Sequence, residues 1–295
     1  MASLVFSLPG GEKLSRQIST QCRIPLGKTV LRSFPDGEIF MRVLPTVKDK
    51  ICFLVGSLNQ PDSKISVLLF LTKTLRDMGV KKIILVCPYL AYMRQDKIFH
   101  KGESLTSKYF AGLLSSLVDE MITVDPHLHR YTTLSEIYSI PSKVIQCAPV
   151  LADWIKQNIK NPFILGPDSE SAQWVSAIAE KCGAHYVVLR KKRLGDKEVV
   201  VTFKNISELK NKTPVIMDDI ISTGHTMIET IKNIVSMGLS KPVCIGIHAV
   251  FAGDAYAKLK QCKPKAIVTA NTIEHVSNQI NVWPLLEKTL KNYVV

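Results

Sequence analysis

An acidic pair and a small-residue loop stand close together in the segment PVIMDDIISTGHT, residues 214–226. Asp218 and Asp219 follow a short apolar run, and their carboxylates are suited to accept hydrogen bonds from the two adjacent hydroxyls of a ribose. The next residues offer hydroxyl and backbone N–H groups just before a helical pattern, where the helix dipole favours a phosphate monoester. These loop residues are Ser222, Thr223, Gly224, His225 and Thr226. A terminal phosphate and a cis-diol at this separation describe a 5-phosphoribosyl group; the alternative is an ordinary strand-to-helix turn capped by Thr226.

A second segment, FPDGE at residues 34–38, has the groups needed to hold a purine. Phe34 would stack on the base, while the carboxylates of Asp36 and Glu38 would accept hydrogen bonds from its amino group. The alternative is a β-turn of Pro-Asp-Gly type between two strands, which we expect to exist whatever else the segment does.

Arg94 and Gln95 lie beyond an apolar run at Ile83–Cys87. A guanidinium fork and an amide are the groups that recognise a polyphosphate and a base. We expect Asp96 to support this arrangement. The alternative is an exposed segment whose charges are merely solvated.

The run RKKRLGDKEV, residues 190–199, places four consecutive cations before a Gly-Asp turn. Four adjacent cations can attract an anionic ligand. The alternative is a solvated basic face. Two further polar residues follow apolar runs: His127 comes after Ile122–Val124, and Asp168 after Phe163–Leu165.

Short runs rich in Val, Ile and Leu alternate with segments of helical period, which is typical of an α/β fold with buried parallel strands. Helices are predicted at Ser63–Met78, ended by Gly79, and at Met227–Met237, ended by Gly238. Ligands of such sheets gather at the carboxyl ends of the strands. The predicted strands are Ile51–Val55, Ile83–Cys87, Ile122–Val124, Val144–Gln146, Phe163–Leu165, Tyr186–Leu189, Val215–Met217, Val243–Ile247 and Ala266–Thr269.

These motifs together resemble the ribose-phosphate diphosphokinase family. Residues 214–226 match a phosphoribosyl fingerprint that the family shares with phosphoribosyltransferases, and the other motifs fall in the diphosphokinase order over nearly the whole chain. They are Phe34-Pro35-Asp36-Gly37-Glu38, Pro88-Tyr89, Arg94-Gln95-Asp96, Asp125-Pro126-His127, Pro167-Asp168 and Lys191-Lys192-Arg193. The chain looks closest to the shorter, archaeal-type members.

The resemblance implies a reaction in which the anomeric hydroxyl of ribose 5-phosphate attacks the β-phosphorus of Mg-ATP and AMP leaves. It implies that the FPDGE loop completes the ATP site of a neighbouring subunit in a homo-oligomer. It also implies that His127 and Asp168 help to hold Mg²⁺ with ATP, and that Lys191 and Arg193 reach the transferring diphosphate from a mobile loop. The fold implied is two phosphoribosyltransferase-like, Rossmann-like domains, each a mainly parallel sheet flanked by helices.

We expect an N-terminal domain of residues 1–142, joined by residues 281–295, and a C-terminal phosphoribosyl-binding domain of residues 143–280. Three departures from the family pattern stand out. Ser169-Glu170-Ser171 replaces a glycine pair, His225 stands where glycine is frequent, and Leu8-Pro9-Gly10-Gly11 replaces a serine-rich turn. Because the serine-rich turn is replaced, we do not extend the family's allosteric control by phosphate or ADP to this chain.

The charge and composition of the chain indicate which partners and which cellular location to expect. A formal net charge of +13 suits anionic ligands, but the basic residues are spread along the chain without a nucleic-acid-binding signature, so nucleic acid is an unlikely partner. No apolar stretch is long enough to span a membrane, and we expect a cytoplasmic protein with its seven cysteines reduced. Two alternatives remain: a phosphoribosyltransferase, which leaves the FPDGE, RQD and KKR motifs unexplained, and a catalytically inactive regulatory relative.

Overall fold

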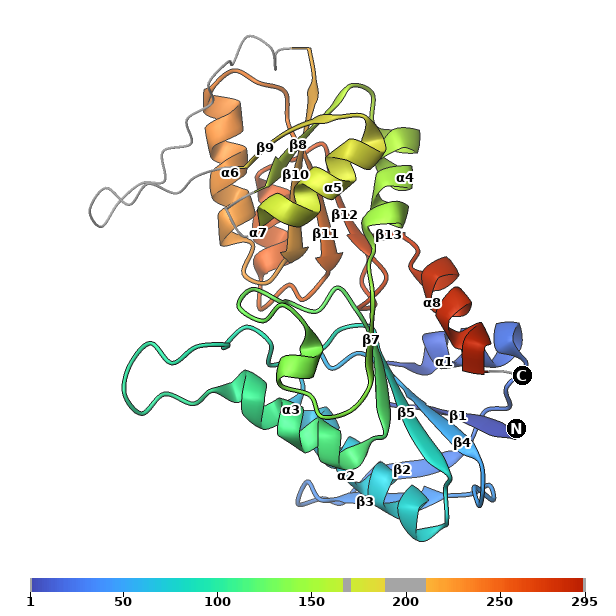
Figure 1. The fold of residues 1–295 in the computed structure, drawn as a ribbon. Coiled ribbons are helices and arrows are strands. Elements are labelled where there is room, and N and C mark those ends of the chain that lie inside the picture. Colours follow the sequence, from blue (N-terminus) through green and yellow to red (C-terminus); the bar gives the residue numbers. More distant parts are fainter. Residues whose placement is uncertain (1, 167–170, 189–210, 294–295) are drawn as a thin grey trace. The chain divides into compact units, whose positions relative to one another are not determined.

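The computed structural model describes residues 2–166, 171–188 and 211–293. The chain divides into two compact units (Figure 1). Unit 1 comprises Met1–Ile145 with Trp283–Val295, and unit 2 comprises Gln146–Val282. Within the described ranges, no helix combines the length and apolarity that a membrane crossing requires. All seven cysteines are free thiols.

Unit 1 is built on a five-stranded parallel sheet of order β1-β4-β5-β6-β7, and an antiparallel hairpin of β2 and β3 stands beside it. Helices α2 and α3 cover one face of the sheet, and α1 and α8 cover the other (Figure 1). The elements are β1 Ser3–Ser7, α1 Glu12–Cys22, β2 Thr29–Ser33, β3 Ile39–Val43, β4 Ile51–Val55, α2 Asp62–Asp77, β5 Lys82–Cys87, α3 Thr106–Leu117, β6 Glu120–Val124, η1 Leu134–Glu136, β7 Ser142–Ile145, α8 Trp283–Leu290 and η4 Lys291–Tyr293.

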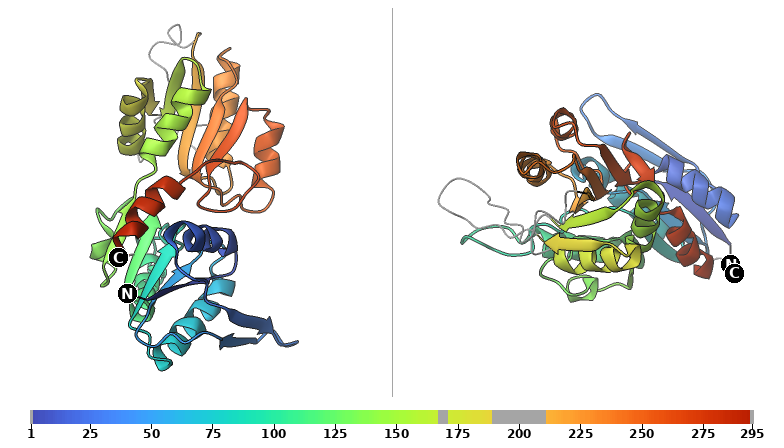
Figure 2. Two further views of the ribbon diagram at one scale, coloured as in Figure 1. Left: turned by 90° about the vertical axis from the view of Figure 1, so that its right-hand side faces the viewer. Right: turned by 90° about the horizontal axis from the view of Figure 1, so that it is seen from above.

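Unit 2 is built on a six-stranded parallel sheet of order β13-β12-β11-β10-β8-β9. Figure 2 shows it sandwiched between α4 and α5 on one face and α6 and α7 on the other. The elements are α4 Ala148–Asn158, β8 Pro162–Gly166, α5 Ala172–Cys182, β9 His185–Val188, β10 Thr213–Ile220, α6 His225–Ser236, β11 Val243–His248, α7 Ala255–Gln261, β12 Ala266–Ala270 and β13 Asn278–Ile280.

The predicted fold class is confirmed. Each of the nine predicted strands overlaps one of β4 to β12, and the two predicted helices overlap α2 and α6. The apolar stripe of α2 buries Leu68, Leu71 and Leu75. Gly79 then takes the left-handed conformation at φ 78°, and its N–H donates to the carbonyl of Arg76. A side chain would strain this backbone, which is why glycine ends the helix there.

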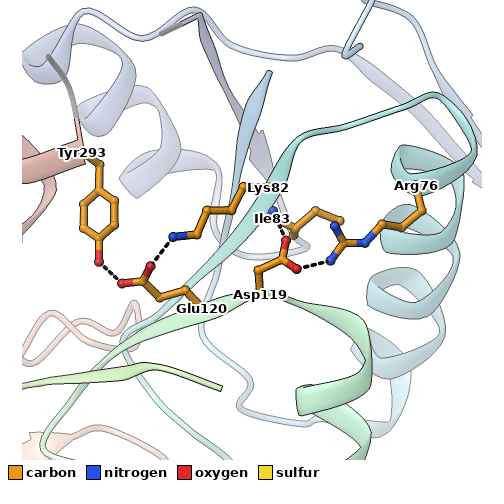
Figure 3. A network of polar contacts seen from close by, with 6 residues as sticks. All are labelled: Arg76, Lys82, Ile83, Asp119, Glu120 and Tyr293. Atoms are coloured by element: carbon orange, nitrogen blue, oxygen red, sulfur yellow. Dashed lines mark hydrogen bonds and ion pairs between the residues drawn. The ribbon is translucent and has the colours of Figure 1, made fainter. Parts of the chain in front are cut away.

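A polar network fixes the C-terminal segment of unit 1 to the sheet (Figure 3). The Tyr293 hydroxyl donates to one oxygen of the buried Glu120 carboxylate, and Lys82 Nζ lies 2.6 Å from the other. Burial and the neighbouring carboxylate raise the pKa of the Tyr293 hydroxyl, so it stays a donor. Beside this group, Asp119 accepts from the Ile83 N–H at 2.7 Å and pairs with Arg76 at 2.8 Å.

Replacing Tyr293 with phenylalanine is expected to lower the free energy of unfolding by about 1–2 kcal/mol, because a buried carboxylate loses one of its donors. Chemical denaturation monitored by fluorescence measures the change. Tyr109→Phe is the matched control, since it removes the same hydroxyl from a ring that is 63% exposed in the same unit. Equal stabilities of the two variants would contradict the prediction.

Candidate active site

The loop at residues 221–224 lies between β10 and α6, and we name it the phosphate loop after its predicted ligand. It is held by the end of β11 and the chain that follows. The Ile221 N–H donates to the carbonyl of His248 at 3.0 Å, and the Phe251 N–H donates to the Ile221 carbonyl at 2.8 Å. The Ala252 N–H donates to the carbonyl of Ser222 at 3.1 Å. These bonds turn two successive loop carbonyls toward the residues after β11.

The carbonyl directions decide where the loop N–H groups point. In a planar trans peptide the C=O and N–H bonds point in opposite directions. The N–H groups of Ser222 and Thr223 therefore point away from Phe251 and Ala252. Successive N–H groups aimed to one side form a concave anion-binding feature, and the positive end of the 12-residue helix α6 adds to it. The local backbone is suited to a phosphate.

Gly224 and the residues after it complete this helix start. Gly224 is the buried N-cap of α6, at φ 69°, a conformation that disfavours any side chain. Thr223 and the first helical residue, His225, are exposed, while Ser222 and Thr226 are half-buried. The imidazole at position 225 thus leaves the helix start intact.

The acidic pair lies within β10, which continues to Ile220 instead of ending before Asp218 as the sequence predicted. Successive side chains of a strand point to opposite faces of the sheet. Ile216 packs in the core beneath α6, so Asp218 lies on the face that α6 covers and Asp219 on the other. Asp219 Oδ1 also accepts the Ile220 N–H at 2.8 Å. The two carboxylates are therefore not equivalent.

Gly246 in β11 contributes to the same strand ends, and the sequence reading overlooked it. It pairs with Asp218 across the sheet, and a Cβ on this residue would meet the Ile221 side chain at 2.5 Å. Ile221, the first loop residue, therefore packs where a side chain on β11 would stand. A glycine inside an otherwise buried apolar strand was the available signal, because such a glycine often marks a close approach.

The FPDGE segment forms the tip of the β2–β3 hairpin in unit 1, which confirms the expected turn. The Phe34 N–H donates to the Glu38 carbonyl at 2.7 Å, and Gly37 adopts φ 95°. Phe34, Asp36 and Glu38 are all exposed, and the Arg32 guanidinium lies 5.8 Å from the Phe34 ring centroid. Asp36 Oδ1 accepts the Glu38 N–H at 3.1 Å. The tip presents an aromatic face and two carboxylates outward.

Arg94, Gln95 and Asp96 lie in the loop after β5, where their environments differ. Arg94 is exposed and Gln95 half-buried, whereas the Asp96 side chain is only 5% exposed. Asp96 Oδ1 accepts from Arg130 Nε at 3.2 Å. The arrangement supports a structural task for Asp96, with Arg130 as a partner that the sequence did not reveal.

His127 follows β6 in unit 1, two residues after a strained position. Asp125 has φ 33°, which is unusual for a residue with a side chain, and its N–H donates to the Ile145 carbonyl at 2.9 Å. His127 is half-buried, and its ring centroid lies 6.2 Å from that of His129. Asp168, Lys191 and Arg193 lie outside the described residues, within which no three His, Cys, Asp or Glu side chains form a group able to hold a metal ion.

Comparison with known proteins identifies the family. Residues 3–117 match the N-terminal domain of ribose phosphate pyrophosphokinase, and residues 133–286 match the phosphoribosyl transferase domain. The ribose-phosphate pyrophosphokinase of Sulfurisphaera tokodaii is 34% identical over 92% of both chains, and that of Saccharolobus solfataricus is 34% identical over 89% of both. The crystal structure of phosphoribosylpyrophosphate synthetase from Mycobacterium smegmatis shares the fold, with a TM-score of 0.87, 22% identity and 99% coverage of both chains. The chain therefore belongs to the ribose-phosphate pyrophosphokinase family.

Proposed function

We propose that the protein is a cytoplasmic ribose-phosphate diphosphokinase that converts ATP and ribose 5-phosphate into AMP and 5-phospho-α-D-ribose 1-diphosphate. The observation that carries this proposal is the strand–loop–helix of unit 2, in which the loop carbonyls turn toward Phe251 and Ala252 and the N–H groups of Ser222 and Thr223 turn away. Membership of the family supports the same reaction.

Ribose 5-phosphate binds along this strand–loop–helix. Its phosphate accepts hydrogen bonds from the loop N–H groups and from the hydroxyls of the residues between Ser222 and Thr226. Its ribose hydroxyls donate to the acidic pair, chiefly to Asp218, which lies on the same face of the sheet as α6. Gly224 keeps the turn free of a side chain at the helix start.

ATP binds residues of unit 1. Phe34 stacks on adenine, and Asp36 and Glu38 accept hydrogen bonds from its amino group; this hairpin tip serves a neighbouring subunit of a homo-oligomer. Arg94 contacts the polyphosphate and Gln95 the nucleotide. Asp96 holds their loop through its bond to Arg130 rather than through the nucleotide.

A magnesium ion would arrive with ATP. Mg²⁺ retains waters and is usually held by one or two protein ligands together with substrate phosphates, so a cage of three or more protein donors is not required. His127 and Asp168 would hold the ion, which would neutralise charge on the phosphate oxygens. The chain itself binds and orients both substrates, so that the anomeric hydroxyl lies in line with the β-phosphorus. Lys191 and Arg193 stabilise the charge that develops on the diphosphate.

The decisive experiment mixes the purified protein with Mg-ATP and ribose 5-phosphate and follows AMP by chromatography. Formation of AMP and phosphoribosyl diphosphate in equal amounts is the expected result. A phosphoribosyltransferase would instead consume phosphoribosyl diphosphate in the presence of a nucleobase, and an inactive relative would form no product. Either of those results would overturn the proposal.

The shared ATP site predicts that Phe34→Ala raises the KM for ATP by about tenfold, because a stacked aromatic surface is lost. Steady-state kinetics at fixed ribose 5-phosphate measure the effect. Phe70→Ala is the matched control, because Phe70 is 46% exposed, close to the 44% of Phe34, and lies on α2 of the same unit. Activity should also fall on dilution to the monomer. A monomer with full activity would contradict the sharing of the site between subunits.

A further inference from the structure

The positioning segment, residues 248–252, begins at the last residue of β11 and sets the directions of the phosphate-loop carbonyls. Three hydrogen bonds of Ile221 and Ser222 end on this segment, at the carbonyl of His248 and the N–H groups of Phe251 and Ala252. A shift of the segment would rotate the same peptide groups that aim the loop N–H groups. The geometry of the loop therefore depends on what holds residues 248–252 in place.

The start of the segment is fixed by a buried bond between neighbouring strand ends. His248 ends β11, and Thr272 lies two residues beyond the end of β12. The two strands are neighbours in the sheet (Figure 1). The Thr272 hydroxyl donates to the Ile247 carbonyl at 2.8 Å and lies 2.9 Å from His248 Nδ1. Both side chains are buried, at 3% and 1% exposure.

This geometry decides which ring nitrogen of His248 carries a proton. A hydroxyl has one hydrogen, and that of Thr272 is directed to the Ile247 carbonyl. Its oxygen must therefore accept the bond from His248, so the proton is on Nδ1. One hydroxyl thus bonds both the Ile247 peptide group and the imidazole.

The far end of the segment is strained and held by aromatic packing. Phe251 adopts φ 37°, a backbone conformation that residues other than glycine rarely take. Such a conformation persists only where the surrounding structure imposes it. Its ring packs on His275, with 4.6 Å between centroids, and on Tyr256 at 5.1 Å. The strained position is the residue whose N–H binds the Ile221 carbonyl, so the strain lies at the contact with the phosphate loop.

We propose that His248 and Thr272 are positioning residues for the 5-phosphate: their buried bond holds the segment 248–252, which in turn aims the N–H groups of Ser222 and Thr223. Neither side chain needs to touch the substrate. The inference rests on the proposed binding of ribose 5-phosphate at this loop. It predicts that loss of the bond weakens phosphate recognition and leaves ATP binding unchanged.

Thr272→Val and Thr272→Ser test the proposal. Valine keeps the volume and removes the hydroxyl, whereas serine keeps the hydroxyl. Isothermal titration of ribose 5-phosphate should show a Kd raised roughly five- to tenfold in Thr272→Val and close to wild type in Thr272→Ser. Inorganic phosphate used as the competing probe should weaken by the same factor, because the effect falls on the phosphate. The KM for ATP should not change.

Thr269→Val is the matched control for a loss of stability. Thr269 is a fully buried threonine on β12 whose hydroxyl bonds Ser277 at 2.8 Å and accepts from Asn278 at 2.9 Å, rather than bonding residues 248–252. Its valine variant should lose thermal stability without losing affinity for ribose 5-phosphate. Unchanged affinity in Thr272→Val, or equal losses in Thr272→Val and Thr269→Val, would overturn the inference while the proposed function stands. A folded wild type that binds no ribose 5-phosphate would overturn both.

Discussion

Replacing Lys191 with alanine is expected to lower kcat by about two to three orders of magnitude, while both KM values stay within several-fold. The physical reason is that charge develops on the diphosphate oxygens only as the bonds loosen. A cation that meets this charge in the transition state contributes little to the binding of either substrate in the ground state. Steady-state kinetics with each substrate varied in turn measure the two effects separately.

Lys192→Ala is the internal control for this experiment. It removes the same charge from the neighbouring position of RKKR, so a purely electrostatic attraction of anionic substrates would penalise both variants equally. A positioned cation at Lys191 leaves the control mildly impaired. Equal losses, or a Lys191 defect confined to the KM values, would show that the basic run only attracts its substrates. Arg193→Ala should behave as Lys191→Ala does.

Asp218→Ala is expected to raise the Kd for ribose 5-phosphate by about ten- to a hundredfold, and Asp219→Ala by distinctly less. Asp218 lies on the face of the sheet that α6 covers, as does the phosphate loop at the start of that helix. Asp219 lies on the opposite face by the alternation of the strand, and one of its oxygens already accepts the Ile220 N–H. Calorimetric titration of each variant with ribose 5-phosphate measures the difference.

The two aspartate variants control for each other, because each removes one carboxylate from the same short stretch of β10. Neither substitution should change the KM for ATP. The affinity for inorganic phosphate, measured by competition, should fall by less than the affinity for ribose 5-phosphate. Equal losses of ribose 5-phosphate affinity would show that the alternation of the strand does not separate the two side chains. Unchanged affinity in both variants would remove the acidic pair from the sugar site.

The strands β4 to β12 and the helices α2 and α6 could be predicted from the sequence because their signals are local. A continuous apolar run such as Ile51–Val55 predicts a buried strand, and glycine after α2 marks the end of that helix. The strands β1, at Ser3–Ser7, and β13, at Asn278–Ile280, were not predicted. Both are short, and their strand conformation depends on pairing with β4 and β12, residues that lie elsewhere in the chain.

The same dependence on local signals explains why only some residues of the candidate site could be predicted from the sequence. Residue type and spacing were enough to single out the acidic pair and the phosphate loop. The contributions of Gly246, His248 and Thr272 depend instead on which strands are neighbours, since each meets the loop or its support across the sheet. Apart from the glycine at position 246 of an apolar strand, such contacts between segments far apart in sequence leave no periodic or compositional signal in a single chain.

The division of the chain has a consequence for its synthesis. Unit 2 is one continuous stretch, Gln146–Val282, whereas unit 1 needs the later residues from Trp283 onward to complete it. Domains emerging from a ribosome generally fold in the order in which they are made. Translation of unit 1 begins before that of unit 2 but ends after it. While unit 2 is translated, the part of unit 1 that α8 and Tyr293 contact is therefore left uncovered. Mutations that slow the docking of α8 would therefore expose newly made chains to aggregation or proteolysis even where the mature protein is stable.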